Sequence, residues 1–203
     1  MKRTLSFLIP VVGWFAIITQ YFIMLENRVT SFPEANLRFF SFFTILTNSL
    51  VAIYFTWLLF GKNREAKTFN NPGALYAITV YITMVCLVYQ FALRHLLQLT
   101  GINIILNELL HSVIPVLVII FWYLYKPLQP DRYTQIATWG IYPLIYLTYI
   151  LFRGHFSNFY PYPFVNVAEL GIKKVLLNSV GIILLFLTVS FVFVFVGKSV
   201  VKK

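Results

Sequence analysis

Charged residues are scarce in this chain. Of its 203 residues only 11% are charged, and just six are aspartate or glutamate, whereas about a quarter of the residues of a typical soluble domain carry a charge. Histidine occurs three times, and cysteine occurs once, as Cys86. A single cysteine excludes a disulfide bond within the chain, and it excludes a zinc or iron–sulfur site built from cysteines.

The net charge of +10 reflects this shortage of acidic residues. Nucleic-acid-binding proteins also have a strongly basic balance, but they gather Lys and Arg on one stripe or helix. Here the basic residues are scattered between apolar runs and cluster at both termini. We therefore expect no nucleic-acid partner, and we relate the charge to orientation in a membrane.

Long apolar runs are what the chain has in abundance. Hydrophobic residues make up 60% of it, and a membrane-spanning helix needs about 20 mostly apolar residues. Six runs approach or exceed this length: residues 5–25, 38–60, 73–94, 103–125, 134–152 and 175–197. They lack the period-two alternation of a membrane β-barrel. The sequence therefore predicts an all-α, integral membrane six-helix bundle that forms a single domain over residues 1–203.

The distribution of Lys and Arg indicates the orientation of the bundle, because cytoplasmic loops are enriched in these residues. If both termini are cytoplasmic, the cytoplasmic segments hold ten of the 16 basic residues and the outer segments hold six. The first run is longer than the apolar core of a signal peptide, which has about 7–15 residues, so we expect it to be retained. The sequence predicts that both termini lie in the cytoplasm.

Polar side chains within the runs are concentrated at one depth. His111 lies eight residues into the fourth run, about 12 Å along a helix from its outer end, and Glu108 lies on the same face three residues earlier. Thr44 lies six residues after Arg38 in the second run, about 9 Å along its helix. The outer halves also hold Gln20, Thr47, Asn48, Gln90, Arg94, Asn107 and Asn178. Because lipid-facing positions do not gather such groups, we expect a shared cavity in the outer half of the membrane; hydrogen bonds between helices alone are the alternative.

A hydroxyl beside an imidazole is the minimum for nucleophilic acyl transfer, because the imidazole removes the hydroxyl proton. Thr44 and His111 lie at similar depths on different helices, so they are our candidate catalytic residues. We expect the Glu108 carboxylate to pair with Arg94, the nearest cation by depth. The candidates for oxyanion donors or supporting groups are Thr47, Asn48, Arg94, Asn107 and Glu108.

Metal catalysis is the main chemical alternative. Glu108 and His111 form an E-x-x-H pair, the spacing found in carboxylate-bridged metal bundles. A zinc site built from His95, His111 and His155 at the outer face is a second possibility. The sequence contains neither an H-E-x-x-H motif nor a second helix rich in carboxylates, so we predict no metal and no cofactor.

Three stretches resemble a known family: RFFSFFTILTNSLVAIYF (38–55), LNELLHSVIPVLVIIFWYLYKP (106–127) and YPYPFVNV (160–167). They resemble the six-transmembrane proteins of bacteria, which look related to the androgen-induced and androgen-dependent membrane proteins of animals. Six runs in matching order cover nearly the whole chain. Animal members are intramembrane hydrolases of fatty acid esters of hydroxy fatty acids that use a Thr nucleophile and a His.

The resemblance implies specific residues for this chemistry. The Thr of the aromatic–Thr–Ile segment is Thr44, and the His that follows "LN" after three residues is His111. Thr47, one turn beyond Thr44, stays open as the nucleophile. The implied function is hydrolysis of a lipid ester in a bacterial cytoplasmic membrane. The alternatives are a non-enzymatic multi-pass protein (lipid-binding protein, scaffold or small transporter) and a metal-dependent membrane hydrolase.

Overall fold

A computed structural model describes residues 1–61, 72–127 and 132–201, and every regular element of these residues is a helix. In chain order the elements are α1 (Lys2–Glu26), α2 (Phe32–Phe39), α3 (Phe43–Phe60), α5 (Pro72–Val88), η1 (Tyr89–Leu93), η2 (Arg94–Leu96), α6 (Ile102–Glu108), η3 (Leu109–Val113), α7 (Ile114–Tyr125), α8 (Gln135–Ser157), η4 (Pro163–Val165) and α9 (Val167–Val201).

Six helical stretches among the described residues are long and apolar enough to cross a membrane. They are Lys2–Glu26, Phe43–Phe60, Gly73–Leu96, Ile102–Tyr125, Gln135–Ser157 and Val167–Ser199. This confirms the expected fold class, an all-α protein with six apolar spans.

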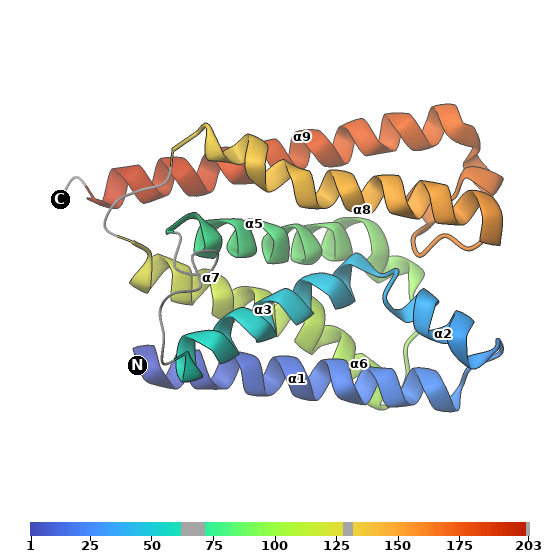
Figure 1. Cartoon of the computed structure of the whole chain (residues 1–203), viewed down its shortest axis with the longest axis horizontal. Coiled ribbons are helices and arrows are strands. Elements are labelled where there is room, and N and C mark those ends of the chain that lie inside the picture. The colour runs from blue at the N-terminus through green and yellow to red at the C-terminus, as the bar shows by residue number, and fades with distance from the viewer. Residues whose placement is uncertain (62–71, 128–131, 202–203) are drawn as a thin grey trace.

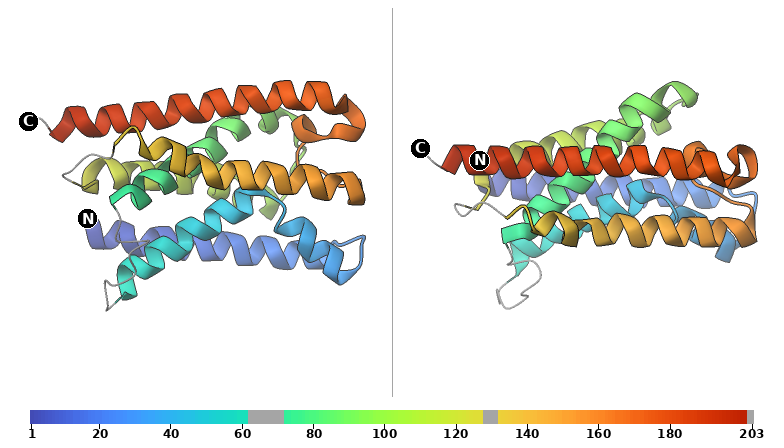
Figure 2. Two further views of the ribbon diagram at one scale, coloured as in Figure 1. Left: turned by 45° about the horizontal axis from the view of Figure 1, so that its top comes forward. Right: turned by 90° about the horizontal axis from the view of Figure 1, so that it is seen from above.

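The spans form a bundle in which both termini lie at the same end (Figure 1). Helices α1, α3, α5 and α7 pack around an apolar core that includes the buried rings of Phe55, Tyr76 and Phe121. Helices α8 and α9 lie side by side along one face of this group (Figures 1 and 2). The bundle therefore consists of a packed group of four spans and a pair that covers it.

The second span begins later than the sequence analysis predicted. Residue 38 was expected to start it, but Arg38 lies in the separate short helix α2, and the chain turns at Phe40–Phe42 before α3 begins at Phe43. The Ser41 hydroxyl donates a hydrogen bond to the carbonyl of Leu37 and so helps to end α2. Thr44 is consequently in the first turn of its helix, not six residues into it.

A π-helical turn interrupts both the third and the fourth span. One is η1, which includes Tyr89 and Gln90, and the other is η3, which includes His111 and Ser112. The rings of Tyr89 and His111 stack with centroids 4.2 Å apart. Single π-helical turns within α-helices are rare and often lie at functional sites.

The connection between α8 and α9 returns into the bundle. Helix α8 ends at Ser157, where Asn158 adopts a left-handed conformation (φ 52°). Gly154 allows the returning chain to pass close to α8, because a Cβ atom there would overlap the ring of Tyr160. This return places Tyr162 inside the protein, with 9% of its surface exposed.

Candidate active site

The Thr44 hydroxyl lies within hydrogen-bonding distance of the His111 imidazole. Thr44 Oγ1 and His111 Nε2 are 3.2 Å apart. The first residue comes from the N-terminal turn of α3 and the second from the π-helical turn η3. The structure thus brings together the two residues that the sequence analysis selected as catalytic candidates.

The other imidazole nitrogen of His111 has a fixed partner. Nδ1 lies 2.9 Å from the carbonyl oxygen of Asn107, four residues earlier. A carbonyl only accepts, so Nδ1 carries a proton when this hydrogen bond forms. In the neutral ring Nε2 is then unprotonated, and it accepts the hydrogen bond from Thr44. The backbone of Asn107 therefore orients the ring and selects the tautomer that a general base needs.

Tyr162 is a third member of this cluster, which the sequence analysis missed. Its hydroxyl oxygen lies 3.3 Å from Thr44 Oγ1 and 3.3 Å from the Thr44 backbone nitrogen. Its ring stacks on Phe164 with an interplanar angle of 5°. Burial raises the pKa of the Tyr162 phenol, while hydrogen bonds with the side chain and backbone of Thr44 act in the opposite direction. The hydroxyl therefore stays protonated at neutral pH and can donate to an oxygen beside Thr44.

The start of α3 supplies backbone donors at the same place. Its first backbone hydrogen bond runs from the N–H of Leu46 to the carbonyl of Phe42, so the N–H groups of Phe43, Thr44 and Ile45 have no acceptor in the preceding turn. Helix N-termini also carry a partial positive charge that favours anions. A negatively charged oxygen next to Thr44 would be stabilised by hydrogen bonds from backbone N–H groups and by the partial positive charge of the helix N-terminus.

A closed ring of hydrogen bonds joins the two π-helical turns. Arg94 donates to Gln90 (2.7 Å) and to Glu108 (2.6 Å). The Ser112 hydroxyl donates to Glu108 (2.7 Å) and accepts from the Gln90 amide (2.8 Å). The expected pairing of Glu108 with Arg94 is confirmed. Because Ser112 follows His111 directly, the ring holds the turn that carries the imidazole.

The remaining polar candidates have other partners. The Asn48 amide nitrogen donates to the carbonyls of Thr44 and Leu110, and the Asn107 amide donates to the Tyr89 hydroxyl. Both amides therefore tie helices together at the site. Thr47 Oγ1 lies 3.2 Å from the Tyr142 hydroxyl, whereas Thr44 contacts the imidazole, so the geometry favours Thr44 as the nucleophile.

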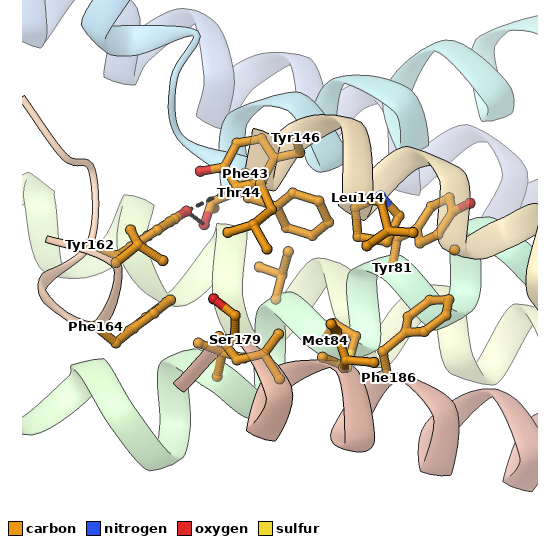
Figure 3. Close-up of a pocket in the computed structure, with 18 of the residues that line it drawn as sticks. Phe43, Thr44, Tyr81, Met84, Leu144, Tyr146, Tyr162, Phe164, Ser179 and Phe186 are labelled. Atoms are coloured by element: carbon orange, nitrogen blue, oxygen red, sulfur yellow. Dashed lines mark hydrogen bonds between the residues drawn. The ribbon is translucent and has the colours of Figure 1, made fainter. Parts of the chain in front are cut away.

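An apolar cavity of about 380 Å³ extends from this cluster into the bundle, with Thr44, His111 and Tyr162 at one end. Its walls come mainly from α5, α8 and α9 (Figure 3). The cavity is within the range of about 300–1,000 Å³ that is usual for small-molecule sites. The expected cavity shared by the whole polar layer is only partly correct, because Asn48, Arg94 and Glu108 do not line it. Their side chains pair with neighbouring helices, and so they leave the cavity walls apolar.

The histidines do not gather into a metal site. Within the described ranges of the chain, no group of three or more His, Cys, Asp or Glu side chains is placed to hold a metal ion. The zinc site considered for His95, His111 and His155 is therefore not formed. Glu108 is engaged by Arg94 and Ser112, which also leaves the E-x-x-H pair without further ligands.

Comparisons of this chain with models of protein families, with curated proteins and with solved structures find no match.

Proposed function

We propose that this membrane protein hydrolyses a lipid ester, with Thr44 as the nucleophile and His111 as the general base. The observation that carries the proposal is the 3.2 Å contact between Thr44 Oγ1 and His111 Nε2 at the end of an apolar cavity. A threonine hydroxyl has little reactivity at neutral pH and needs an adjacent base. An apolar cavity next to such a pair suits a substrate with a hydrocarbon chain.

In the first half of the reaction, Thr44 Oγ1 attacks the carbonyl carbon of the ester and its proton passes to His111 Nε2. The tetrahedral intermediate then collapses. Its carbon–oxygen bond to the alcohol breaks, and the departing oxygen takes the proton from Nε2. The products of this half are a free alcohol and an acyl group bound to Thr44.

In the second half, water attacks the acyl carbon and gives a proton to His111 Nε2. The bond from the acyl carbon to Thr44 Oγ1 breaks, and this oxygen regains the proton. A carboxylic acid leaves, and Thr44 and His111 return to their starting forms. The carbonyl of Asn107, 2.9 Å from Nδ1, orients the imidazole throughout and takes the place of the carboxylate in a serine-type triad.

The oxygen that becomes negative in each half needs donors that are already in place. The N–H groups of Phe43 and Ile45 have no acceptor in the preceding turn, whereas the Thr44 N–H donates to the Tyr162 hydroxyl, which lies 3.3 Å from Thr44 Oγ1. We assign the oxyanion site to the Phe43 and Ile45 N–H groups and the Tyr162 hydroxyl. Asn48 and Asn107, considered for this task from the sequence, are already used by other acceptors.

The sharpest test is covalent labelling of the purified protein in lipid nanodiscs by a fluorophosphonate with a long alkyl chain. We expect the adduct on Thr44, located by peptide mass spectrometry. Thr47→Ala is the matched control, because Thr47 lies one turn away and should leave labelling intact. An adduct on Thr47, or equal labelling of the wild type and Thr44→Ala, would reject the assignment of Thr44.

A non-enzymatic lipid-binding protein is the second candidate, since the same apolar cavity also suits a bound lipid. Turnover separates the two. The wild type should release free acid from lipid esters at a rate that Thr44→Ala does not reach. A protein that only binds lipid would give equal, background release for both.

The proposal places both termini in the cytoplasm of a bacterial cell, with the Thr44–His111 pair in the outer half of the membrane. Cysteines introduced in a Cys86→Ser background test this orientation. An impermeant thiol reagent added to intact cells should label Ser157→Cys, at the end of α8, and should not label Ser199→Cys, near the end of α9. The reverse pattern would move the site to the inner leaflet.

A further inference from the structure

We infer that the apolar cavity measures the acyl chain of the substrate, and that Gly140 and Phe186 set the longest chain it accepts. The inference rests on the proposed function, because it needs the ester carbonyl to lie at Thr44. The inference goes beyond the proposed function by assigning the length of the acyl chain and the residues that limit this length.

One end of the cavity is polar and reactive, and the rest is apolar. Thr44 and Tyr162 lie toward the reactive end (Figure 3), where His111 contacts Thr44, while the long walls are made almost entirely of aliphatic and aromatic side chains. Leu144 and Ile183 line the cavity and are also exposed on the surface that faces lipid, at 52% and 37%. A hydrocarbon chain can therefore enter between α8 and α9 without crossing a polar barrier.

The acyl arm of the ester, not the alcohol arm, belongs in this cavity. Once Thr44 is acylated, the alcohol has to leave and water has to take its place, whereas the acyl group stays bound. If the alcohol arm filled the cavity, it would have to leave into the lipid between α8 and α9, and water would have to follow through an apolar cavity to reach the acyl carbon. With the acyl arm inside, the alcohol leaves outward and water enters where it was.

Three walls give a length of about 12–15 Å from the Thr44–His111 contact to the far end of the cavity. On α8 the lining runs from Leu147 to Ile136, and the ten residues from Tyr146, beside Thr44, to Ile136 cover about 15 Å along the axis. On the third span the lining runs from Leu93 to Tyr81, and the eight residues from Tyr89, which stacks on His111, to Tyr81 cover about 12 Å. On α9 the lining between Ser179 and Leu187 also covers about 12 Å.

The far end of the cavity is closed. The Tyr81 hydroxyl donates to the carbonyl of Trp139 at 2.8 Å, which ties α5 to α8 there. Ile136 and Phe186 are buried beside it. Gly140 faces Phe186 from the opposite wall, since a Cβ atom at Gly140 would lie 3.7 Å from the Phe186 ring.

The length of the cavity converts into a number of carbons. An extended chain advances about 1.2 Å per bond, since a three-bond peptide residue spans at most about 3.6 Å. A cavity of about 12–15 Å therefore holds about ten to twelve carbons beyond the reacting carbonyl. Gly140 lies six residues from Tyr146, so a large side chain there would stop the chain at about 9 Å, or about seven carbons.

The test measures hydrolysis of p-nitrophenyl esters with 4 to 18 carbons by protein in nanodiscs. We expect the wild-type rate to be highest for acyl chains of about eleven to thirteen carbons, the carbonyl carbon included. Gly140→Leu should move the optimum to about eight carbons and lower the rate for the dodecanoyl ester at least tenfold. Phe186→Leu, which opens the far end, should move the optimum to longer chains.

Gly181→Leu is the matched control. Gly181 lies on α9 within the same span but does not line the cavity, and a Cβ atom there would meet nothing within 4 Å. The same substitution at this position should leave the chain-length profile unchanged. Identical profiles for the wild type, Gly140→Leu and Phe186→Leu would overturn the inference while leaving hydrolysis at Thr44 intact.

A binding measurement separates the inference from the proposed function. Dodecanoic acid with a diazirine at its last carbon is irradiated with the Thr44→Ala protein, and the crosslinked peptides are identified. We expect crosslinks near Ile136 and Phe186 that Gly140→Leu removes and Gly181→Leu keeps. If these crosslinks form but the wild type hydrolyses no ester, the proposed enzyme activity is rejected and the acyl-chain site is retained. Crosslinks confined to the outer surface would overturn the acyl site itself.

Discussion

The α5 span and the α8 span have similar lengths but very different surroundings. In the most apolar part of the α5 span 56% of the residues are buried within the protein, against 17% in the α8 span. Helix α5 is enclosed by α3, α7 and α9, whereas much of α8 faces outward (Figure 2). A buried span has its side chains fixed by neighbours on most sides, and an outer span has lipid on one side.

Under the proposed function, this difference separates two tasks. Thr44, His111 and the ring of hydrogen bonds that holds η3 all belong to the packed group, where a distance such as 3.2 Å can be maintained. The outer pair, α8 and α9, supplies the cavity wall that lies next to lipid. A substrate needs an opening on the side of the lipid, and catalysis needs a rigid arrangement, so the two tasks favour different parts of the bundle.

The largest expected effect on activity comes from substitutions in the packed group of four spans. Thr44→Ala and His111→Ala should each lower kcat by about 10⁴-fold or more, because the two residues act as one unit. For the same reason the double variant should be scarcely slower than either single one, when ester hydrolysis is measured on matched amounts of folded protein. Thr44→Ser keeps the hydroxyl and should retain activity. Additive losses in the double variant would contradict a shared step.

Tyr162 tests whether the connection between the two outer spans takes part in the chemistry. Tyr162→Phe removes the hydroxyl beside Thr44 and keeps the ring that stacks on Phe164. We expect kcat to fall about 100-fold, the loss typical of one oxyanion donor, with little change in KM. Tyr160→Phe, the same change two residues away, is the control. Equal rates for both variants would assign Tyr162 to packing alone.

A smaller effect is expected from the ring that positions the imidazole. Ser112→Ala leaves one Glu108 oxygen without its 2.7 Å donor, and loss of a part-buried hydrogen bond of this kind costs about 0.5–1.5 kcal/mol. If this loss appears as displacement of His111, kcat should fall by up to about tenfold at constant KM. Ser190→Ala, a change of the same kind on α9 at a buried residue that does not line the cavity, should leave kcat unaltered. A larger fall in kcat for the control variant than for Ser112→Ala would contradict the distinction between the packed group, which holds Thr44 and His111, and the outer pair of helices.

The smallest effect concerns an ion pair that links α2 to α8. Glu34 Oε1 accepts hydrogen bonds from Arg38 and Arg153, both at 2.8 Å. The hydrogen bond from Arg38 is the main cause that holds the pKa of Glu34 below its usual value. Burial raises this pKa, and the hydrogen bond and charge of Arg153 lower it further. A lowered pKa means that the folded protein favours the charged carboxylate, so the stabilisation is present above the ordinary pKa and is lost as the pH falls through the lowered one.

Glu34→Gln should therefore lower the Tm slightly at neutral pH, by a free energy of about 1 kcal/mol or less. The difference between the two proteins should disappear when thermal unfolding in nanodiscs is followed down to pH values below the lowered pKa. Glu169→Gln, which removes a carboxylate in the first turn of α9, serves as the control. A difference that grows at low pH would contradict the sign of the shift.

The sequence was sufficient to predict the six spans and to select Thr44 with His111, and Glu108 with Arg94, as candidate pairs. Each of these depends on composition and on depth along a helix, and both are properties of one chain segment at a time. Thr44 and His111 still lie at the same depth although the second span starts at Phe43. The turn at Phe40–Phe42 ends one helix and precedes the next, and Thr44 remains in the polar layer beside His111.

Other features could not be derived in this way. Phe40 and Phe42 continue the aromatic run that leads into α3, so hydropathy does not reveal the break. Hydrogen bonds between the third and fourth spans join η1 and η3, from Gln90 to Ser112 and from Arg94 to Glu108. Tyr162 reaches Thr44 only because the chain returns past Gly154. Its motif YPYPF gave one usable signal, since prolines on both sides of a tyrosine restrict the backbone.

The π-helical turn at His111 also has a consequence for insertions and deletions. A π-helical turn closes over one residue more than an α-helical turn, and each residue of an α-helix rotates the following ones by about 100°. Removing one residue between Leu109 and Val113 would convert the segment to a regular α-helix and leave α7 in its present register, while the imidazole would turn away from Thr44. A related chain with a one-residue gap at this point would keep the fold and lose the pair.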